Sequence, residues 1–185
     1  EEDTGEWVCS CPSPNDMRYR HGKHPLFGSH GVNDASTEPD AIDAWPDTFP
    51  LNVAIALTDT LVVIDIDDPQ VAAALLDPAL GLRDVVTIST TGRGLHLWLA
   101  CAPTASGILK HKATTERIGE IRASGWYVVI PPSRHSTGRQ YAWLGPTLLE
   151  HGPTRTTQDA WSYARELLAS VGVEFIDRRD VAGHQ

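Results

Sequence analysis

Two aspartates two positions apart are the first candidates for chemistry in this sequence. Residues 61–64 form an apolar run that leads directly into Asp65, Ile66 and Asp67. Alternate side chains of a β-strand share a face, so Asp65 and Asp67 point the same way, with Cα atoms about 7 Å apart. Neighbouring carboxylates repel each other, and Mg²⁺ or Mn²⁺, which prefer hard oxygen ligands, would remove that conflict. The alternative is a solvated acidic cluster in a turn between a strand and a helix.

Glu120 is a third acidic candidate, and it stands in a strand-like segment two positions before Arg122. On one strand face, Glu120 could complete a three-carboxylate metal site, while Arg122 could bind phosphate or balance the acid. The alternative is a cross-strand ion pair, which stabilises a protein surface only weakly. These residue types therefore allow either a metal site or a structural ion pair.

A histidine that follows a glycine-rich turn is another candidate. The turn at residues 91–94 contains Arg93 and Gly94, and glycine lets backbone N–H groups approach an anion closely. His96 then lies on the opposite strand face from its apolar neighbours, where its ring could donate to a phosphate oxygen. The alternative is a buried histidine bonded to a nearby backbone group. Residues 131–135 form a second polar turn, made rigid by two prolines, which presents the Ser133 hydroxyl.

Charge is distributed unevenly along the 185 residues, whose net charge is −9. Arg83 is the only Lys or Arg between Asp34 and Asp84, whereas six basic residues accompany two acidic ones from Lys110 to Arg139. A negative total argues against nucleic-acid binding, but a local basic surface could still follow a phosphate backbone. A solvated surface without a partner fits these counts equally well.

The cysteines indicate a compartment rather than a site. Cys9, Cys11 and Cys101 are too few for a disulfide framework and fit a reducing cytoplasm. Cys9 and Cys11 could bind zinc together with His21 and His24, but the gap between the two cysteines is shorter than zinc sites use. We therefore expect no zinc site. No apolar run approaches the ~20 residues that span a bilayer, so no membrane association is expected.

The periodicity of the chain predicts strands in its middle and helices around them. Strands are expected at residues 7–9, at 53–57 and 61–66 around a turn, and at 85–90, 95–100, 117–122 and 126–130, with an extended segment at 141–144 and a mobile loop at 103–115. Helices are expected after Pro39, with Ile42 and Trp45 facing inward, at 69–76 with Asp68 as its N-cap, and at 157–171. The predicted class is α+β with a mixed or antiparallel sheet, and residues 1–185 are expected to form a single domain.

Seven segments carry a more specific signal through their order along the chain. They are GKHPL at 22–26, NVAIA at 52–56, DID at 65–67, GLHLW at 94–98, EIR at 120–122, GWYVVIPPS at 125–133 and GRQYAW at 138–143. Together they resemble the bifunctional primase–polymerase domain of plasmid and phage replication proteins, in the archaeo-eukaryotic primase superfamily. The resemblance covers residues 23–143.

This resemblance implies a fold and a set of site residues. The fold is an RNA-recognition-like mixed sheet with a second small αβ unit and flanking helices, and the active site lies between the two units. Asp65 and Asp67 match the first acidic motif, and His96 matches the histidine that holds the incoming triphosphate. Glu120 stands where the third metal-binding acid is usually Asp, and Arg93 stands where a small residue is common. The zinc-bearing insertion of some relatives has no counterpart.

The implied activity is template-directed nucleotidyl transfer, as DNA primase and DNA polymerase, with two Mg²⁺ or Mn²⁺ ions held by the three acids. We expect His96 and four further residues to orient the triphosphate: Lys23, Arg93, Arg122 and Ser133. We expect template phosphates to contact Arg134, Arg139, Lys110 and Lys112.

The resemblance also implies partners and leaves two other classes open. Such domains are typically followed by a helical segment and a helicase, so the chain is expected to be part of a longer replication protein. Its expected partners are a single-stranded DNA template, a primer and NTP or dNTP, in the cytoplasm of a bacterial host. One alternative is a metal-dependent nuclease or relaxase-like initiator, which needs a nucleophilic Tyr or a His–hydrophobic–His pair. The other is an inactive nucleotide- or origin-binding module, which only the Glu at position 120 favours.

Overall fold

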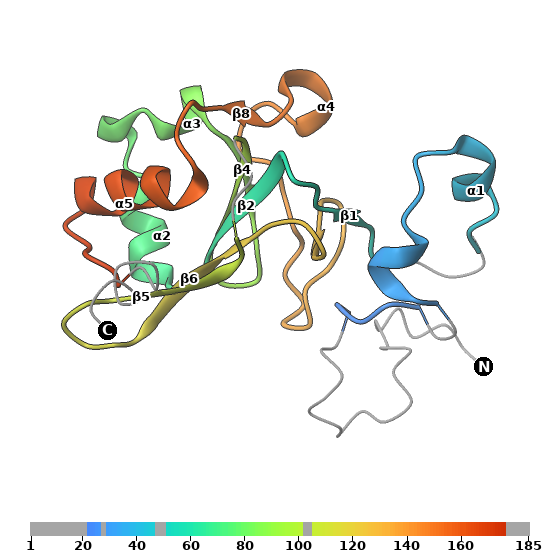
Figure 1. Ribbon diagram of the computed structural model, residues 1–185, viewed down its shortest axis with the longest axis horizontal. Coiled ribbons are helices and arrows are strands. Elements are labelled where there is room, and N and C mark those ends of the chain that lie inside the picture. The colour runs from blue at the N-terminus through green and yellow to red at the C-terminus, as the bar shows by residue number, and fades with distance from the viewer. Residues whose placement is uncertain (1–21, 27–28, 47–50, 102–104, 177–185) are drawn as a thin grey trace.

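The computed structural model describes residues 22–26, 29–46, 51–101 and 105–176. Its centre is a six-stranded sheet with the order β3-β4-β2-β6-β5 and with β8 alongside β4 (Figure 1). The strands are β2 (Leu61–Ile66), β3 (Thr87–Thr90), β4 (Leu95–Ala100), β5 (Gly107–Lys110), β6 (Arg117–Arg122) and β8 (Thr154–Arg155). Neighbouring strands are antiparallel except β4 and β8. The strand that carries the paired aspartates is therefore central and paired on both edges.

A second sheet of two strands packs beside the large one. In it β1 (Ala54–Ala56) pairs antiparallel with β7 (Tyr127–Val129). The chain passes from β1 into β2 and from β6 into β7, so both strands of the small sheet continue into the large one. Leu57, Val63, Trp98 and Val128 form an apolar cluster that joins the two sheets.

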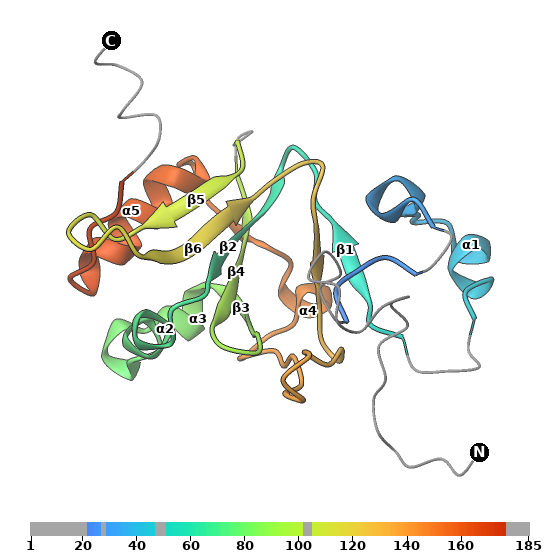
Figure 2. The same cartoon turned by 90° about the horizontal axis from the view of Figure 1, so that it is seen from below.

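Helices cover the other face of the large sheet. The two that pack there are α2 (Pro69–Leu75) and α5 (Ala160–Ser170). The remaining helices are short: α1 (Pro39–Asp43), α3 (Leu82–Val85), α4 (Leu148–His151) and 3-10 turns at Gly31–Asp34 and Pro78–Leu80. In both views α1 and β1 lie on the side away from α2 and α5 (Figures 1 and 2).

Local sequence explains where the two packed helices begin and end. The Asp68 carboxylate accepts hydrogen bonds from the N–H groups of Gln70 and Val71 at 2.8 and 3.0 Å, which caps α2 as predicted. Asp159 caps α5 in the same way. Gly172 follows α5 with a φ of +75°, a left-handed conformation that glycine adopts without steric cost.

Side-chain alternation gives the large sheet two unlike faces. On the helix-covered face, Ile64 of β2 lies between Leu97 of β4 and Ile121 of β6, and all three are at most 1% exposed. The next residue of β2, Asp65, points to the opposite face, towards the small sheet. The same strands thus supply the core on one side and polar groups on the other.

Most of the predicted elements are confirmed. The α+β class holds, as do the strands at 61–66, 95–100 and 117–122, and the extended segment at 141–144 runs along β3. No helix among the described residues is long and apolar enough to cross a membrane. The strand predicted at 7–9 and three of the considered zinc ligands, Cys9, Cys11 and His21, lie outside the described residues.

Four predictions about elements are wrong. Residues 107–110 form β5 rather than a loop, because pairing with β6 and burial of Leu109 hold them in a sheet. Val85 ends α3 instead of starting a strand. The strand near residue 54 pairs with β7 rather than with β2. Ile42 and Trp45 are 39% and 44% exposed, because the five-residue α1 buries none of its residues.

Candidate active site

A row of polar side chains crosses the face of the large sheet that the helices do not cover. Asp65 at the centre lies directly opposite His96 of β4 on one side and Glu120 of β6 on the other. Ser89 of β3 lies opposite His96 and extends the row. Directly opposite residues share a face. Strand pairing therefore brings together Asp65, His96 and Glu120, which are far apart in the sequence.

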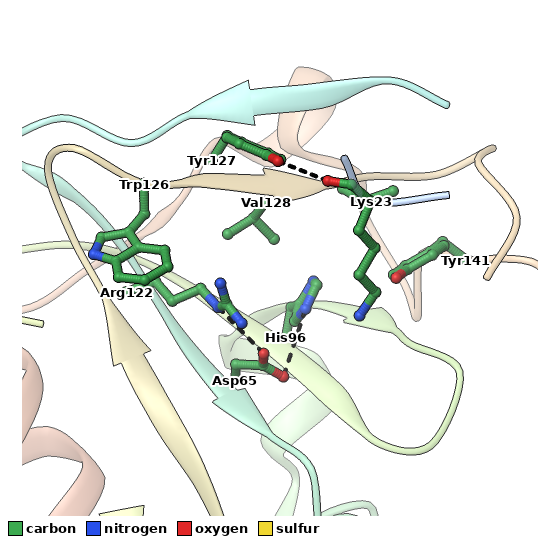
Figure 3. Close-up of a pocket in the computed structure, with 9 residues that line it drawn as sticks. Lys23, Asp65, His96, Arg122, Trp126, Tyr127, Val128 and Tyr141 are labelled. Atoms are coloured by element: carbon green, nitrogen blue, oxygen red, sulfur yellow. Dashed lines mark hydrogen bonds and ion pairs between the residues drawn. The ribbon is translucent and has the colours of Figure 1, made fainter. Parts of the chain in front are cut away.

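A pocket of about 230 Å³ lies over this row, between the large sheet and β7. The nine lining residues come from both sheets and three loops (Figure 3): Lys23, Asp65, His96, Arg122, Trp126, Tyr127, Val128, Val129 and Tyr141. Four of them were predicted as site residues, namely Lys23, Asp65, His96 and Arg122. The predicted position of the site between two units of the fold agrees with this pocket.

Ion pairs link the three candidate carboxylates to three arginines in an alternating series. Asp67 Oδ1 and Oδ2 lie 3.1 Å from Arg93 Nη2 and 2.9 Å from Arg117 Nη2. Arg117 also reaches Glu120 Oε2 at 3.3 Å. Glu120 is paired in turn with Arg122, whose Nε lies 3.4 Å from Asp65 Oδ2. Each carboxylate at the site is therefore balanced by at least one guanidinium group.

A β-bulge explains why Arg117 belongs to this series. Its position in β6 differs from that of Glu120 by three residues, and strict alternation would place the two on opposite faces. The pairing of β5 with β6 shifts register at Leu109 and Lys110, so β6 carries one extra residue there. Such a bulge redirects the side chain that precedes it. Arg117 consequently joins Glu120 and Asp67 on the site face.

Burial makes the charged forms of the central residues unfavourable. The pKa of Asp65 is raised, first by burial and then by the negative charge of Asp67. The pKa of His96 falls from 6.5 to about 3, mainly because burial disfavours the imidazolium and also because Lys23 and Arg122 are cationic. His96 is thus neutral, and its Nε2 lies 3.6 Å from Asp65 Oδ1.

Two glycines flank the end of β2 that carries the aspartates. A Cβ atom on Gly94 would lie 1.8 Å from the Ile66 carbonyl oxygen, and one on Gly119 would lie 2.1 Å from the Asp65 carbonyl oxygen. Neither position can hold a side chain without a shift of the backbone. The turn amides of Arg93 and Gly94 donate to Thr91 Oγ1 at 3.2 and 2.9 Å, so they are already bonded within the turn. Gly94 is therefore required because the Ile66 carbonyl oxygen leaves no room for a side chain, and its N–H group is not free to bind an anion.

The other predicted site residues lie away from the pocket. The Ser133 hydroxyl accepts from the Val53 N–H at 2.8 Å and so ties the loop after β7 to the segment before β1. Arg134 and Arg139 are exposed in that loop. Lys110 and Lys112 are exposed at the end of β5, where Lys112 Nζ lies 3.7 Å from Glu174. The four basic residues form two separate groups rather than one surface.

Four site residues were not found from the sequence: Arg117, Trp126, Tyr127 and Tyr141. Trp126 is 50% exposed at the pocket rim, with its ring centroid 5.4 Å from the Arg122 guanidinium carbon. Tyr127 and Tyr141 stand in two of the segments on which the family resemblance rests, which was the available signal. For Arg117 there was none, because the bulge depends on strand pairing.

The three carboxylates fit a divalent cation in chemical type and in charge. Asp65 and Glu120 share one face of the sheet, and Arg117 links Asp67 to Glu120. The three supply hard oxygen ligands and include a pair whose mutual repulsion a cation would relieve. To bind one, the carboxylates must turn from their arginine partners. As they stand, within the described part of the chain no group of three or more His, Cys, Asp or Glu side chains could hold a metal ion.

Fold and site together define a primase-like α+β domain, with acidic residues and a neutral histidine on the face of an antiparallel sheet that the helices do not cover. The chain belongs to the family of bifunctional DNA primase/polymerase N-terminal domains, which matches residues 7–157. Membership supports a primase or polymerase function in replication. No match was found among curated proteins.

Proposed function

We propose that this domain is a template-directed nucleotidyltransferase that makes or extends primers, acting as DNA primase and DNA polymerase. The observation that carries the proposal is the row in which Asp65 lies between His96 and Glu120, with Asp65 and His96 lining a pocket. Phosphoryl transfer needs positioning and charge stabilisation rather than covalent work by the protein. A pocket that combines a carboxylate with two cations and a neutral imidazole, and has two further acids beside it, supplies both.

Two kinds of side chain would divide the work at the site. Lys23 and Arg122 place positive charge in the pocket and would hold the triphosphate, together with the neutral ring of His96. Asp65, Asp67 and Glu120 would hold Mg²⁺ or Mn²⁺, which in such sites activates the attacking hydroxyl and stabilises the leaving pyrophosphate. Arg93 and Arg117, released from Asp67 when it turns away, would be available to phosphate oxygens.

The nucleic acid would approach from the basic loops. Arg134 and Arg139 after β7 and Lys110 and Lys112 at the end of β5 are exposed and would contact template phosphates. Sequence information would come from base pairing rather than from side chains that read base edges. We propose that the partners are a single-stranded template with its primer and, in the full-length protein, a helicase.

Primer extension tests the proposal. A labelled primer on a single-stranded template, with dNTPs and Mn²⁺, is given to wild type, to Asp65→Ala/Asp67→Ala, and to Asp59→Ala/Asp84→Ala, which removes two exposed acids outside the row. We expect the site variant to lose activity by about 10³-fold or more, and the control variant to keep it.

Circular dichroism of each variant shows whether it is folded. Extension by the folded site variant at the wild-type rate would contradict the assignment of the acids. Strand scission without added nucleotide would favour a nuclease instead. Absence of extension by folded wild type, with primer and Mn²⁺ present, would favour a binding module.

A further inference from the structure

Tyr141 is a pocket residue that the proposed chemistry does not use. It is 2% exposed, and its ring packs near those of His96 and His135, with centroid distances of 6.0 and 6.1 Å. Its backbone N–H donates to the Ser133 carbonyl at 2.8 Å. Packing and the backbone bond together fix where the hydroxyl lies.

The Tyr141 hydroxyl is buried without a hydrogen-bond partner among the described residues. Figure 3 shows it directed into the pocket, towards the side chains of Lys23 and His96. Nδ1 of His96 is also buried and without a partner in the same part of the structure. Buried polar groups normally have partners, because an unmatched one loses its bonds to water. Two unmatched atoms in one pocket therefore point to a ligand that the structure does not contain.

A second tyrosine in the pocket shows the contrasting arrangement. The Tyr127 hydroxyl donates to the backbone carbonyl of Lys23 at 2.6 Å (Figure 3), and so connects β7 to the loop that carries this lysine. The Tyr127 hydroxyl thus has its hydrogen-bond partner within the protein. Tyr141 also lines the pocket, but its hydroxyl has no such partner among the described residues and can bond to a ligand.

The surroundings of Tyr141 indicate which kind of ligand group its hydroxyl would bind. Burial, and then the negative charge of Asp65, raises the pKa of Tyr141, so the phenol keeps its proton and can donate. Lys23 and Arg122 line the same pocket and bring positive charge to it. A donor beside two cations favours an anionic acceptor oxygen. Among the parts of a nucleotide, only the phosphates carry such oxygens.

We infer that the Tyr141 hydroxyl donates a hydrogen bond to a phosphate oxygen of the incoming nucleoside triphosphate and fixes it against the pocket floor. The inference rests on the proposed function for the identity of the ligand. Tyr141 would thus bind the triphosphate as a neutral hydrogen-bond donor, whereas Lys23 and Arg122 would bind it through their positive charge.

Tyr141→Phe is a clean test, because it removes the hydroxyl and keeps the ring that packs on the two histidines. Titration calorimetry without primer measures the binding of dNTP with Mn²⁺, and separately of inorganic triphosphate. We expect Kd for both to rise about tenfold, the loss of one hydrogen bond to a charged acceptor. Thermal unfolding without ligand is expected to give an unchanged or raised Tm, since an unmatched buried hydroxyl is removed.

Tyr127→Phe is the stability control, and its Tm is expected to fall because its hydroxyl is bonded within the protein. A lower Tm of Tyr141→Phe with unchanged Kd would overturn the inference and make the hydroxyl structural. Unchanged Kd at unchanged Tm would overturn it too, and point to a bound water. Weaker binding of dNTP but not of inorganic triphosphate would overturn the phosphate contact and indicate the sugar or base. If the wild-type protein incorporates nucleotides and the Tyr141→Phe variant binds them with normal Kd, this inference alone is refuted. If the wild-type protein binds triphosphate but does not incorporate nucleotides, only the proposed polymerase activity is refuted.

Discussion

The two faces of the large sheet are built from the same strands and serve opposite purposes. On the helix-covered face, Ile64 lies between Leu97 and Ile121, and burial of apolar area there stabilises the fold. One residue further along, Asp65 lies on the other face, where burial raises the pKa of its carboxyl group. The helix side must therefore supply the stability with which the site side keeps its buried polar groups in place.

The largest effect on stability is expected from the helix-covered face. Leu168 of α5 is completely buried in that core. Leu168→Ala should lower the free energy of unfolding by about 2–5 kcal/mol, because it leaves a cavity. Urea denaturation measures the loss, and nucleotide incorporation per folded molecule should not change. Leu149→Ala, at a side chain 99% exposed in α4, should change stability by less than about 0.5 kcal/mol. A similar loss in both variants would show that the helix side is not the stabilising one.

An intermediate effect is expected from pH, through His96. Because burial lowers the pKa of this histidine from 6.5 to about 3, the unfolded chain takes up a proton between these values and the folded protein does not. The free energy of unfolding should therefore decrease as pH falls below 6.5, with this residue contributing a slope of at most about 1.4 kcal/mol per pH unit.

Urea denaturation at several pH values in EDTA checks the slope in wild type and in His96→Gln, which should lose that contribution. His135, whose pKa is also lowered by burial, keeps part of the slope in both proteins. Equal slopes in wild type and His96→Gln would show that His96 carries no such penalty.

The smallest effect is expected at Asp65, with the opposite sign to a core mutation. A carboxyl whose pKa is raised above 3.8 in the folded state costs stability once pH exceeds that value. Asp65→Asn should therefore raise the free energy of unfolding at pH 7 by about 1 kcal/mol, the size common when a strained functional group is replaced. The gain should vanish below pH 3.8, where the acid is protonated in both states. A loss of stability at pH 7 would mean that the ion pair with Arg122 outweighs burial.

Local signals in the sequence predicted much of the helix-covered face and the centre of the site. The Asp68 cap of α2 and the alternation along β4 are properties of neighbouring residues, and both were confirmed. The spacing of Asp65 and Asp67 is equally local, and both acids lie in the series of ion pairs with arginines. The bulge that recruits Arg117, the pairing of β1 with β7, and the approach of Tyr141 to His96 depend on contacts between distant segments. The spacing of Ile42 and Trp45 predicts that both lie on one side of a helix. Whether another part of the protein packs against that side depends on the tertiary structure, and both residues are exposed.

The two glycines beside the acidic end of β2 have a consequence for how substitutions in this domain will be interpreted. Gly94 and Gly119 meet backbone carbonyls where any side chain would intrude. In a survey of random variants both positions would show the intolerance usually credited to catalytic groups, although neither offers a functional atom to a substrate. Their constraint would extend to alanine, the mildest replacement, whereas Glu120, which we propose as a metal ligand, would be expected to accept its shorter homologue Asp. The set of tolerated substitutions at each position would thus distinguish residues with a functional side chain from glycines that are required for steric reasons.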